Sequence, residues 1–163
     1  MNCLEKFKGI PYCFWKPGFD EPIYKIDKLP SLECLKKQGT CCSGLLNLLM
    51  ISMSKKSIGG TEDWYSHLIT LDSTKKINID LLESTLIPRG SVVFSNYIDC
   101  ENQGHIAIVT SDNMLLNDSL ITHAIGRKHI GNGLYGPGVI EESINETLFM
   151  YSHVCLGNSW MEK

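Results

Sequence analysis

The sequence lacks the features that mark several classes of protein. No C-x-x-C pair occurs among its seven cysteines, so a structural zinc site is not expected. The odd cysteine count leaves at least one thiol unpaired within the chain, and a reducing compartment is the simpler interpretation, with one or two disulfides left open. The net charge of −3 and the pI near 5.9 give no electrostatic basis for binding nucleic acid or an anionic membrane.

Long hydrophobic runs are also missing. The longest, residues 45–53, is far too short to span a bilayer, and the first six residues carry no hydrophobic signal core. We therefore expect a protein that is cytoplasmic or exported by a non-classical route. The chain has 163 residues, 43 % of them apolar, and no internal repeat or low-complexity segment. This predicts one domain over residues 1–163.

The chain changes character near its middle, from helical patterns to short strands. Apolar spacing predicts helices at 32–37, 42–53, 61–71 and 80–86, and the second of these is apolar on nearly all sides. β-Branched runs bounded by Gly, Asn and Asp predict strands at 91–94, 105–109, 120–125, 139–140 and 148–156. Because no long helices separate these runs, we expect an antiparallel meander and an α+β fold.

A cysteine stands at the start of the apolar helix. Thr40 is the predicted N-cap, which places Cys42 in the first turn. The unpaired N–H groups and the positive end of the helix macrodipole favour a thiolate there, and a thiolate is a nucleophile. The alternative is that Cys42 is a small buried apolar residue.

Two histidines lie on consecutive predicted strands. If residues 112–116 form the connecting loop, His105 and His123 face each other, whereas a turn at 111–113 places Asn117 opposite His105. Either partner could orient an imidazole that takes a proton from a thiol, as a cysteine hydrolase requires. The alternatives are that His105 is a satisfied core histidine and that His123 is an ordinary strand residue.

Six short motifs follow one another along the chain: Gly9-Ile10-Pro11-Tyr12, Cys42-Ser43-Gly44-Leu45, Pro88-Arg89-Gly90-Ser91-Val92-Val93-Phe94, Gly104-His105-Ile106-Ala107-Ile108-Val109, Ile121-Thr122-His123-Ala124 and Gly138-Val139-Ile140. The residues of these motifs and their order resemble those of the NlpC-type cysteine peptidases, papain-like enzymes that cut peptide cross-bridges of bacterial cell walls. The resemblance covers roughly residues 9–143 and implies a papain-like α+β fold, with a buried nucleophile helix packed on an antiparallel sheet.

The resemblance also implies roles for individual residues. Cys42 would be the nucleophile, His105 the general base and His123 the orienting residue, with Asn117 as its rival. The Cys42 backbone N–H would hold part of the oxyanion. The substrate-binding positions would be Tyr12, which lines the pocket beside the thiol, Cys41 and Ser43. No cofactor and no metal is expected.

The sequence departs from the family pattern at two informative places. Cys41 stands where the family usually has an aspartate that holds the substrate's amino group, so the usual specificity is not expected to transfer. The gap between His105 and His123 is longer than the commonest spacing, which keeps Asn117 in contention. The longer hairpin and the missing signal peptide resemble small amidase effectors injected through the type VI secretion system. That subgroup suggests an inhibitor or immunity protein as a partner.

Together these features predict a cysteine hydrolase that cleaves an amide bond through a thiol acyl-enzyme. The leading substrate is a peptidoglycan peptide. We expect the protein to be a monomer. The alternatives are a protein-directed cysteine peptidase, deamidase or acyltransferase on the same scaffold, or a non-catalytic binding module. Residues 16–28 lie between the Tyr12 motif and the nucleophile, and we expect them to shape or cover the cleft.

Overall fold

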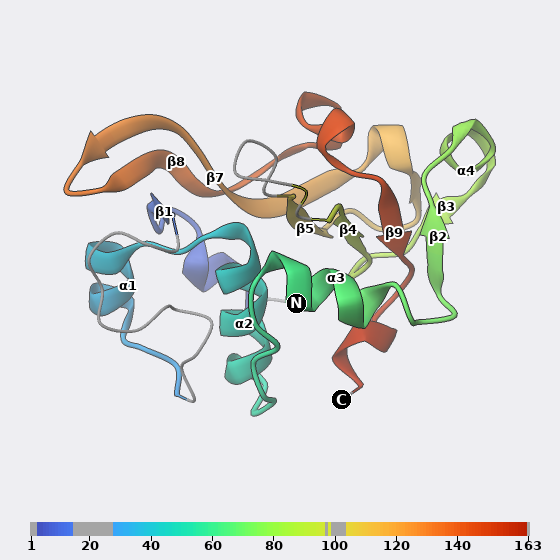
Figure 1. The fold of residues 1–163 in the computed structure, drawn as a ribbon. Helices are drawn as coiled ribbons and strands as arrows, with labels where there is room; N and C mark the ends of the chain where they lie inside the picture. Colours follow the sequence, from blue (N-terminus) through green and yellow to red (C-terminus); the bar gives the residue numbers. More distant parts are fainter. Residues whose placement is uncertain (1–2, 15–27, 97, 99–103, 163) are drawn as a thin grey trace. The chain divides into compact units, whose positions relative to one another are not determined.

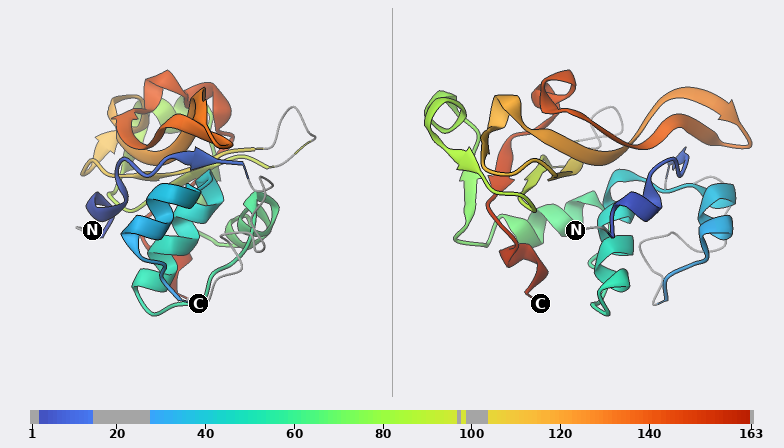
Figure 2. Two further views of the ribbon diagram at one scale, coloured as in Figure 1. Left: turned by 90° about the vertical axis from the view of Figure 1, so that its left-hand side faces the viewer. Right: turned by 180° about the vertical axis from the view of Figure 1, so that it is seen from behind.

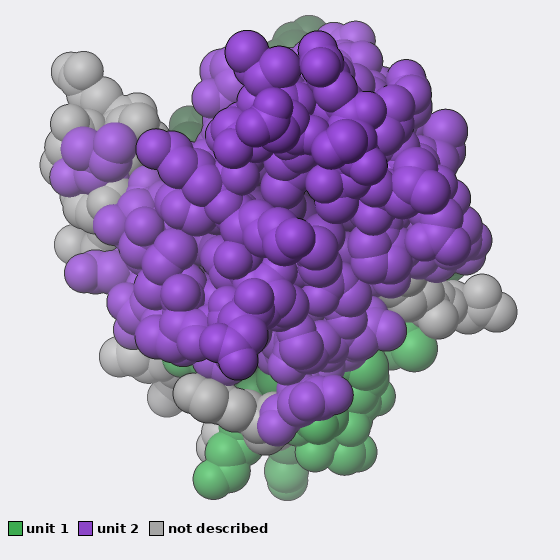
Figure 3. All heavy atoms as spheres, turned by 90° about the vertical axis from the view of Figure 1, so that its right-hand side faces the viewer, with its two compact units in different colours: residues 1–60, 123–140 green, residues 61–122, 141–163 purple. Residues whose placement is uncertain are grey.

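A computed structural model describes residues 3–14, 28–96, 98 and 104–162. The chain forms two compact units, coloured separately in Figure 3. Unit 1 comprises Met1–Gly60 and His123–Ile140, and unit 2 comprises Thr61–Thr122 and Glu141–Lys163. Residues 16–27, most of the segment expected to shape the cleft, lie outside the described part of the chain. Helices and antiparallel strands are both present, so the α+β class is confirmed.

Two α-helices belong to unit 1. The first, α1 (Leu32–Gln38), is capped by Ser31, whose hydroxyl accepts a hydrogen bond from the Cys34 N–H at 3.2 Å. The second, α2 (Cys42–Ser52), is buried at every position from Cys42 to Met50, which confirms the prediction of a helix buried on nearly all sides.

One polar side chain inside α2 is fully satisfied. The Asn47 amide donates to the Gly59 carbonyl at 2.7 Å and its oxygen accepts from the Ile58 N–H at 3.0 Å. A buried amide needs such partners, since an unpaired one would cost stability. These bonds also hold the segment that follows α2 against the helix.

The strands of unit 1 are β1 (Tyr12–Cys13) and the unit's share of β7 (Leu120–Gly131) and β8 (Leu134–Ser143). Asn132 and Gly133 join β7 to β8 with φ values of 51° and 72°, as a type I′ hairpin turn requires. Strand β1 pairs antiparallel with β8, with Tyr12 opposite Tyr135. Both views of Figure 2, like Figure 1, show β1 between this hairpin and helices α1 and α2.

The sheet of unit 2 has the order β7-β5-β4-β9-β2. Its strands are β5 (Ile106–Val109), β4 (Val92–Phe94), β9 (His153–Cys155) and β2 (Thr74–Lys76), and neighbours pair antiparallel. Strands β4, β5 and β7 follow the predicted meander. The prediction is wrong for β9, which pairs with β4 instead of β8. A second, two-stranded sheet joins β3 (Leu86–Ile87) to β6 (Met114–Leu115).

The helices of unit 2 are short. They are α3 (Thr61–Leu68), α4 (Ile79–Ser84) and the 3₁₀ turns η3 (Leu116–Asp118), η4 (Ile144–Glu146), η5 (Leu148–Met150) and η6 (Ser159–Met161). The strand expected at 148–156 is therefore a strand only over β9, because its first residues form η5. Within the described residues, no helix combines the length and apolarity needed to cross a membrane.

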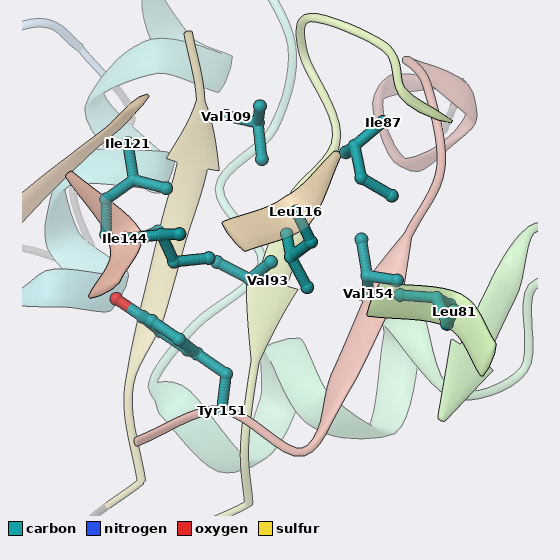
Figure 4. Packing of buried hydrophobic residues seen from close by; sticks show 10 residues of the cluster. Leu81, Ile87, Val93, Val109, Leu116, Ile121, Ile144, Tyr151 and Val154 are labelled. Carbon is teal, nitrogen blue, oxygen red and sulfur yellow. The ribbon is translucent and has the colours of Figure 1, made fainter. Parts of the chain in front are cut away.

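The core of unit 2 gathers side chains from several of its short helices and strands (Figure 4). It consists of Leu81, Ile87, Val93, Ala107, Val109, Leu116, Ile121, Ile144, Tyr151 and Val154. Burying such side chains is the main stabilising contribution to a domain of this size, at about 1.5–3 kcal/mol for each large one. This core fixes β4 and β5, and with them the residue that precedes β5, His105.

Candidate active site

Helix α2 begins at Cys42 as predicted, but its N-cap lies one residue later than expected. Its N-cap is Cys41, whose sulfur accepts a hydrogen bond from the Gly44 N–H at 3.3 Å and lies 3.4 Å from the Ser43 hydroxyl. The expectation that Thr40 caps the helix is wrong, because Thr40 is part of an extended bridge to Tyr12. The backbone N–H and carbonyl of Thr40 serve that bridge, and its hydroxyl donates to the Cys41 carbonyl, so the next residue takes over the cap.

Cys42 is consequently the first helical residue, inside the first turn as predicted. Only 5 % of it is exposed. Its N–H group is one of the four at a helix start that have no acceptor within the helix. Among the described cysteines none forms a disulfide; they are Cys3, Cys13, Cys34, Cys41, Cys42 and Cys155. Cys42 is therefore a thiol at the positive end of a helix dipole, an environment that favours the thiolate.

Tyr12 lies beside this helix start. The Thr40 N–H donates to the Pro11 carbonyl at 2.9 Å and the Cys13 N–H donates to the Thr40 carbonyl at 3.1 Å, which fixes Tyr12 next to the segment that enters α2. Burial raises the pKa of the Tyr12 phenol, and its electrostatic interactions with Cys42, Cys41 and Cys13 raise it further. The phenol therefore stays protonated and can donate a hydrogen bond beside the thiol.

Cys13 lies in an environment that disfavours the thiolate, unlike that of a nucleophilic cysteine. Burial raises its pKa to about 11, with a further contribution from the charge of Cys41. Its thiol donates to the Phe14 carbonyl at 3.1 Å. A thiol with such a pKa is protonated at neutral pH and reacts slowly.

His105, directly before β5, is held by its backbone. Its N–H donates to the Ser95 hydroxyl at 3.1 Å and its carbonyl accepts from the Ser95 N–H at 2.9 Å. Gly104 has φ +69°, and a Cβ there would lie 2.6 Å from the Asn96 carbonyl oxygen, which explains the glycine in the Gly-His motif. The chain therefore passes close to the residues that follow β4, and this contact fixes the backbone position from which the His105 side chain projects.

Tyr151 is a neighbour of His105 that the sequence did not reveal. The two rings are 5.7 Å apart between centroids and inclined at 35°. Both residues are buried, with 4 % of His105 and 7 % of Tyr151 exposed. Tyr151 therefore packs beside the His105 imidazole. The only signal was an aromatic residue in the last apolar run.

The two candidates for the third position lie in different elements. His123 is fully buried in β7, within unit 1. Asn117 lies in η3, within unit 2, and its side-chain oxygen is buried without a hydrogen-bond donor among the described residues. An unsatisfied acceptor of this kind is what an orienting residue offers to an imidazole N–H.

Both strand registers expected for this region are wrong. Ile108 lies opposite Thr122, whereas facing histidines require Leu120 there and the Asn117 register requires Met114. The reason is that β5 and β7 are not joined by a simple loop. Their connection contains β6, which pairs with β3, and then η3.

The predicted site residues divide between the two units. Unit 1 contains the substrate-binding candidates together with Cys42 and His123, while unit 2 contains His105 and Asn117. The assignment of Cys42, His105 and His123 as a triad stays a prediction. No three His, Cys, Asp or Glu side chains of the described chain gather in a way that could hold a metal ion.

No protein-family model matches the sequence, and no curated protein does. Among solved structures, the chain is similar to a Staphylococcus aureus Mu50 protein described as similar to lipoprotein, NLP/P60 family. The identity is 17 % and the TM-score 0.46, over 97 % of this chain and 40 % of that one. It is also similar to the wild-type endolysin LysIME-EF1, with 13 % identity and a TM-score of 0.47, over 94 % of this chain and 62 % of the endolysin. The chain thus spans less than two thirds of either protein.

Proposed function

We propose that the protein is a cysteine hydrolase on a papain-like scaffold, with Cys42 as its nucleophile. The observation that carries the proposal is the position of Cys42, a buried thiol at the first residue of α2 beside the protonated Tyr12. Helix starts lower the pKa of a thiol, and a neighbouring donor can stabilise charge that develops on the substrate. The order of the Cys-Ser-Gly and Gly-His motifs supports the same reading.

In the proposed mechanism His105 takes the proton of the Cys42 thiol, and the thiolate attacks the carbonyl carbon of an amide. The Cys42 N–H donates to the oxyanion. The tetrahedral intermediate collapses as His105 returns the proton to the leaving amine, which gives a thioester. Water, deprotonated by His105, then attacks the thioester and releases the carboxylic acid and the free thiol. No cofactor takes part.

We propose a peptidoglycan peptide as the substrate, because the motifs resemble those of cell-wall peptidases. Purified protein incubated with cell walls should release soluble muropeptides, and Cys42→Ala should abolish the release. The measurement is chromatography of the digest with mass identification of the products. Activity on a protein substrate, with no release from several wall types, would move the assignment to a protein-directed peptidase, deamidase or acyltransferase.

His123→Ala and Asn117→Ala separate the two candidates for the orienting residue. The correct one should lower kcat by about tenfold or more while KM changes little, since it acts on the base rather than on substrate binding. Kinetics on one defined peptide, together with circular dichroism of each variant, measure this. Equal and small losses in both variants would remove both residues from the mechanism.

A further inference from the structure

A row of four aromatic rings crosses unit 1, made of Tyr12, Phe14, Tyr135 and His129; we call it the aromatic row. The centroid distances are 5.0 Å from Tyr12 to Phe14, 5.1 Å from Phe14 to Tyr135 and 5.2 Å from Tyr135 to His129. Each neighbouring pair meets edge to face, the arrangement that aromatic rings prefer. The rings therefore form one continuous surface.

The row is partly buried at its Tyr12 end and open at its other end. Tyr12 is sheltered enough for its pKa to rise, whereas 39 % of Phe14 is exposed and His129 is exposed as well. None of the four rings belongs to the fully buried core. Phe14 is thus an exposed apolar ring held between two partly buried tyrosine rings, where it can contact a bound side chain.

The backbone is built to hold these rings. Strand pairing sets Tyr12 opposite Tyr135. A Cβ at Gly126 would lie 2.6 Å from the Tyr12 ring and 2.9 Å from the Tyr135 Cβ, so a glycine in β7 makes the room that the rings occupy. Because the rings stand on paired strands, they form a more precise surface than a loop would.

The sheltered end of the row starts at the candidate nucleophile. Tyr12 bridges to Thr40, and Thr40 precedes Cys42 by two residues. The spacing between neighbouring rings corresponds to about one and a half residues of an extended peptide. A peptide attacked at Cys42 and extended along the row would contact Phe14 with a side chain near the scissile bond.

We propose that the aromatic row is a substrate subsite, which binds an apolar side chain next to the amide bond that Cys42 attacks. This inference rests on the proposed function and adds the side chain that the enzyme would prefer next to the scissile bond. None of the four ring side chains carries a carboxylate, so the row offers no counter-charge to a basic side chain and favours an apolar one.

Peptidyl chloromethyl ketones test the subsite, because a thiolate displaces their chloride and leaves a thioether. Two probes would differ only in carrying leucine or glycine at the residue that bears the ketone. The rate at which each alkylates Cys42, measured by mass spectrometry, is divided by the iodoacetamide rate at the same cysteine. This division removes differences in intrinsic thiol reactivity between variants.

The wild-type protein should prefer the leucine probe by about tenfold, the usual effect of filling an apolar pocket. Phe14→Ala should lose most of this preference and Phe14→Tyr should keep it. Phe149→Ala is the matched control, since Phe149 is 86 % exposed in unit 2, and it should leave the preference unchanged.

Two results would overturn the inference, and they differ in what they say of the function. If Cys42 reacts rapidly with iodoacetamide but the preference is absent or survives Phe14→Ala, the subsite is wrong and the nucleophile stands. If Cys42 reacts no faster than the other thiols, the proposed function fails and the subsite fails with it.

Discussion

At the scale of single residues, Cys41 does a task that usually falls to an oxygen-bearing side chain. Its sulfur accepts a hydrogen bond from the Gly44 N–H at 3.3 Å and so caps α2. Sulfur is a weak acceptor, whereas serine, aspartate and asparagine are the preferred caps. The cap therefore stabilises the helix less than it could.

Changing the cap should change stability in a predictable direction. Cys41→Asp should raise the free energy of unfolding by about 1 kcal/mol, and Cys41→Ala should lower it by about 0.5 kcal/mol. Urea denaturation of the three proteins measures both effects. An aspartate variant no more stable than the alanine variant would contradict the capping role.

His153 gives a second prediction, on pH dependence. Burial lowers its pKa from the usual 6.5, and the positive charge of Lys76, its partner across the β2–β9 pair, lowers it further. A depressed histidine pKa means that the folded state disfavours the proton. The contribution of His153 to stability is thus complete above pH 6.5 and declines as the pH falls below that value.

Removing the neighbouring charge should move this pKa upward. In Lys76→Gln the His153 imidazole should titrate closer to its ordinary value, which an NMR titration of the ring protons measures. Lys75→Gln is the matched control, since Lys75 is the adjacent lysine and lies opposite Val154. The same His153 pKa in wild type and Lys76→Gln would show that burial alone shifts it.

At the scale of elements, Gly138 in β8 holds the N-terminal segment close. It has φ +81°, and a Cβ there would collide with the Ile10 carbonyl oxygen and lie 2.8 Å from the Pro11 Cα. The Val139 N–H donates to the Ile10 carbonyl at 2.8 Å and the Gly9 N–H donates to the Val139 carbonyl at 2.9 Å. The approach of these backbones is what positions Tyr12.

Gly138→Ala should therefore cost at least about 2–3 kcal/mol of unfolding free energy, because it adds a backbone collision to an unfavourable φ. Gly9→Ala is a matched control: its φ is +79°, but a Cβ there meets nothing within 4 Å. It should cost only about 1–2 kcal/mol. Equal losses in urea denaturation would show that the close approach contributes nothing.

The sequence predicted long elements better than short ones. Helix α2 has eleven residues, which is long enough for its apolar period to be recognised. The prediction that it is buried on nearly all sides is confirmed. Strands β1, β3 and β6 have two residues each and β2 has three, so they carry no usable period. Because β6 went unseen, the β5–β7 register was wrong by two residues in the facing-histidine version.

For the site, the sequence predicted local positions and missed what depends on the tertiary fold. The place of Cys42 in the first helical turn followed from the local pattern. The cap at Cys41 did not, because it depends on the bridge that removes Thr40. The Tyr151 ring beside His105 could not be found either, since 46 positions separate them and only the fold brings them together.

At the scale of the whole molecule, neither unit is continuous in sequence. Each takes two segments of chain, and strands β7 and β8 each contribute residues to both units. Unfolding of either unit would therefore disrupt two strands that continue into the other unit. We predict a single cooperative transition, as expected for the one domain over residues 1–163.

Differential scanning calorimetry measures this directly. The calorimetric enthalpy should equal the van't Hoff enthalpy within error, because the whole chain unfolds together. Far-UV circular dichroism and tryptophan fluorescence should give the same midpoint. Two resolved transitions would show that the units unfold independently and would contradict the single-domain prediction.

The central claim is that Cys42 is a nucleophile activated by His105, and the rate of alkylation at each cysteine tests it most directly. With iodoacetamide at neutral pH, quantified peptide by peptide, Cys42 should react at least about tenfold faster than every other thiol, with Cys13 among the slowest. His105→Ala should slow Cys42 and leave Cys34 unchanged. Equal rates at all the cysteines, or a Cys42 rate indifferent to His105→Ala, would contradict the account and leave a binding module as the better description.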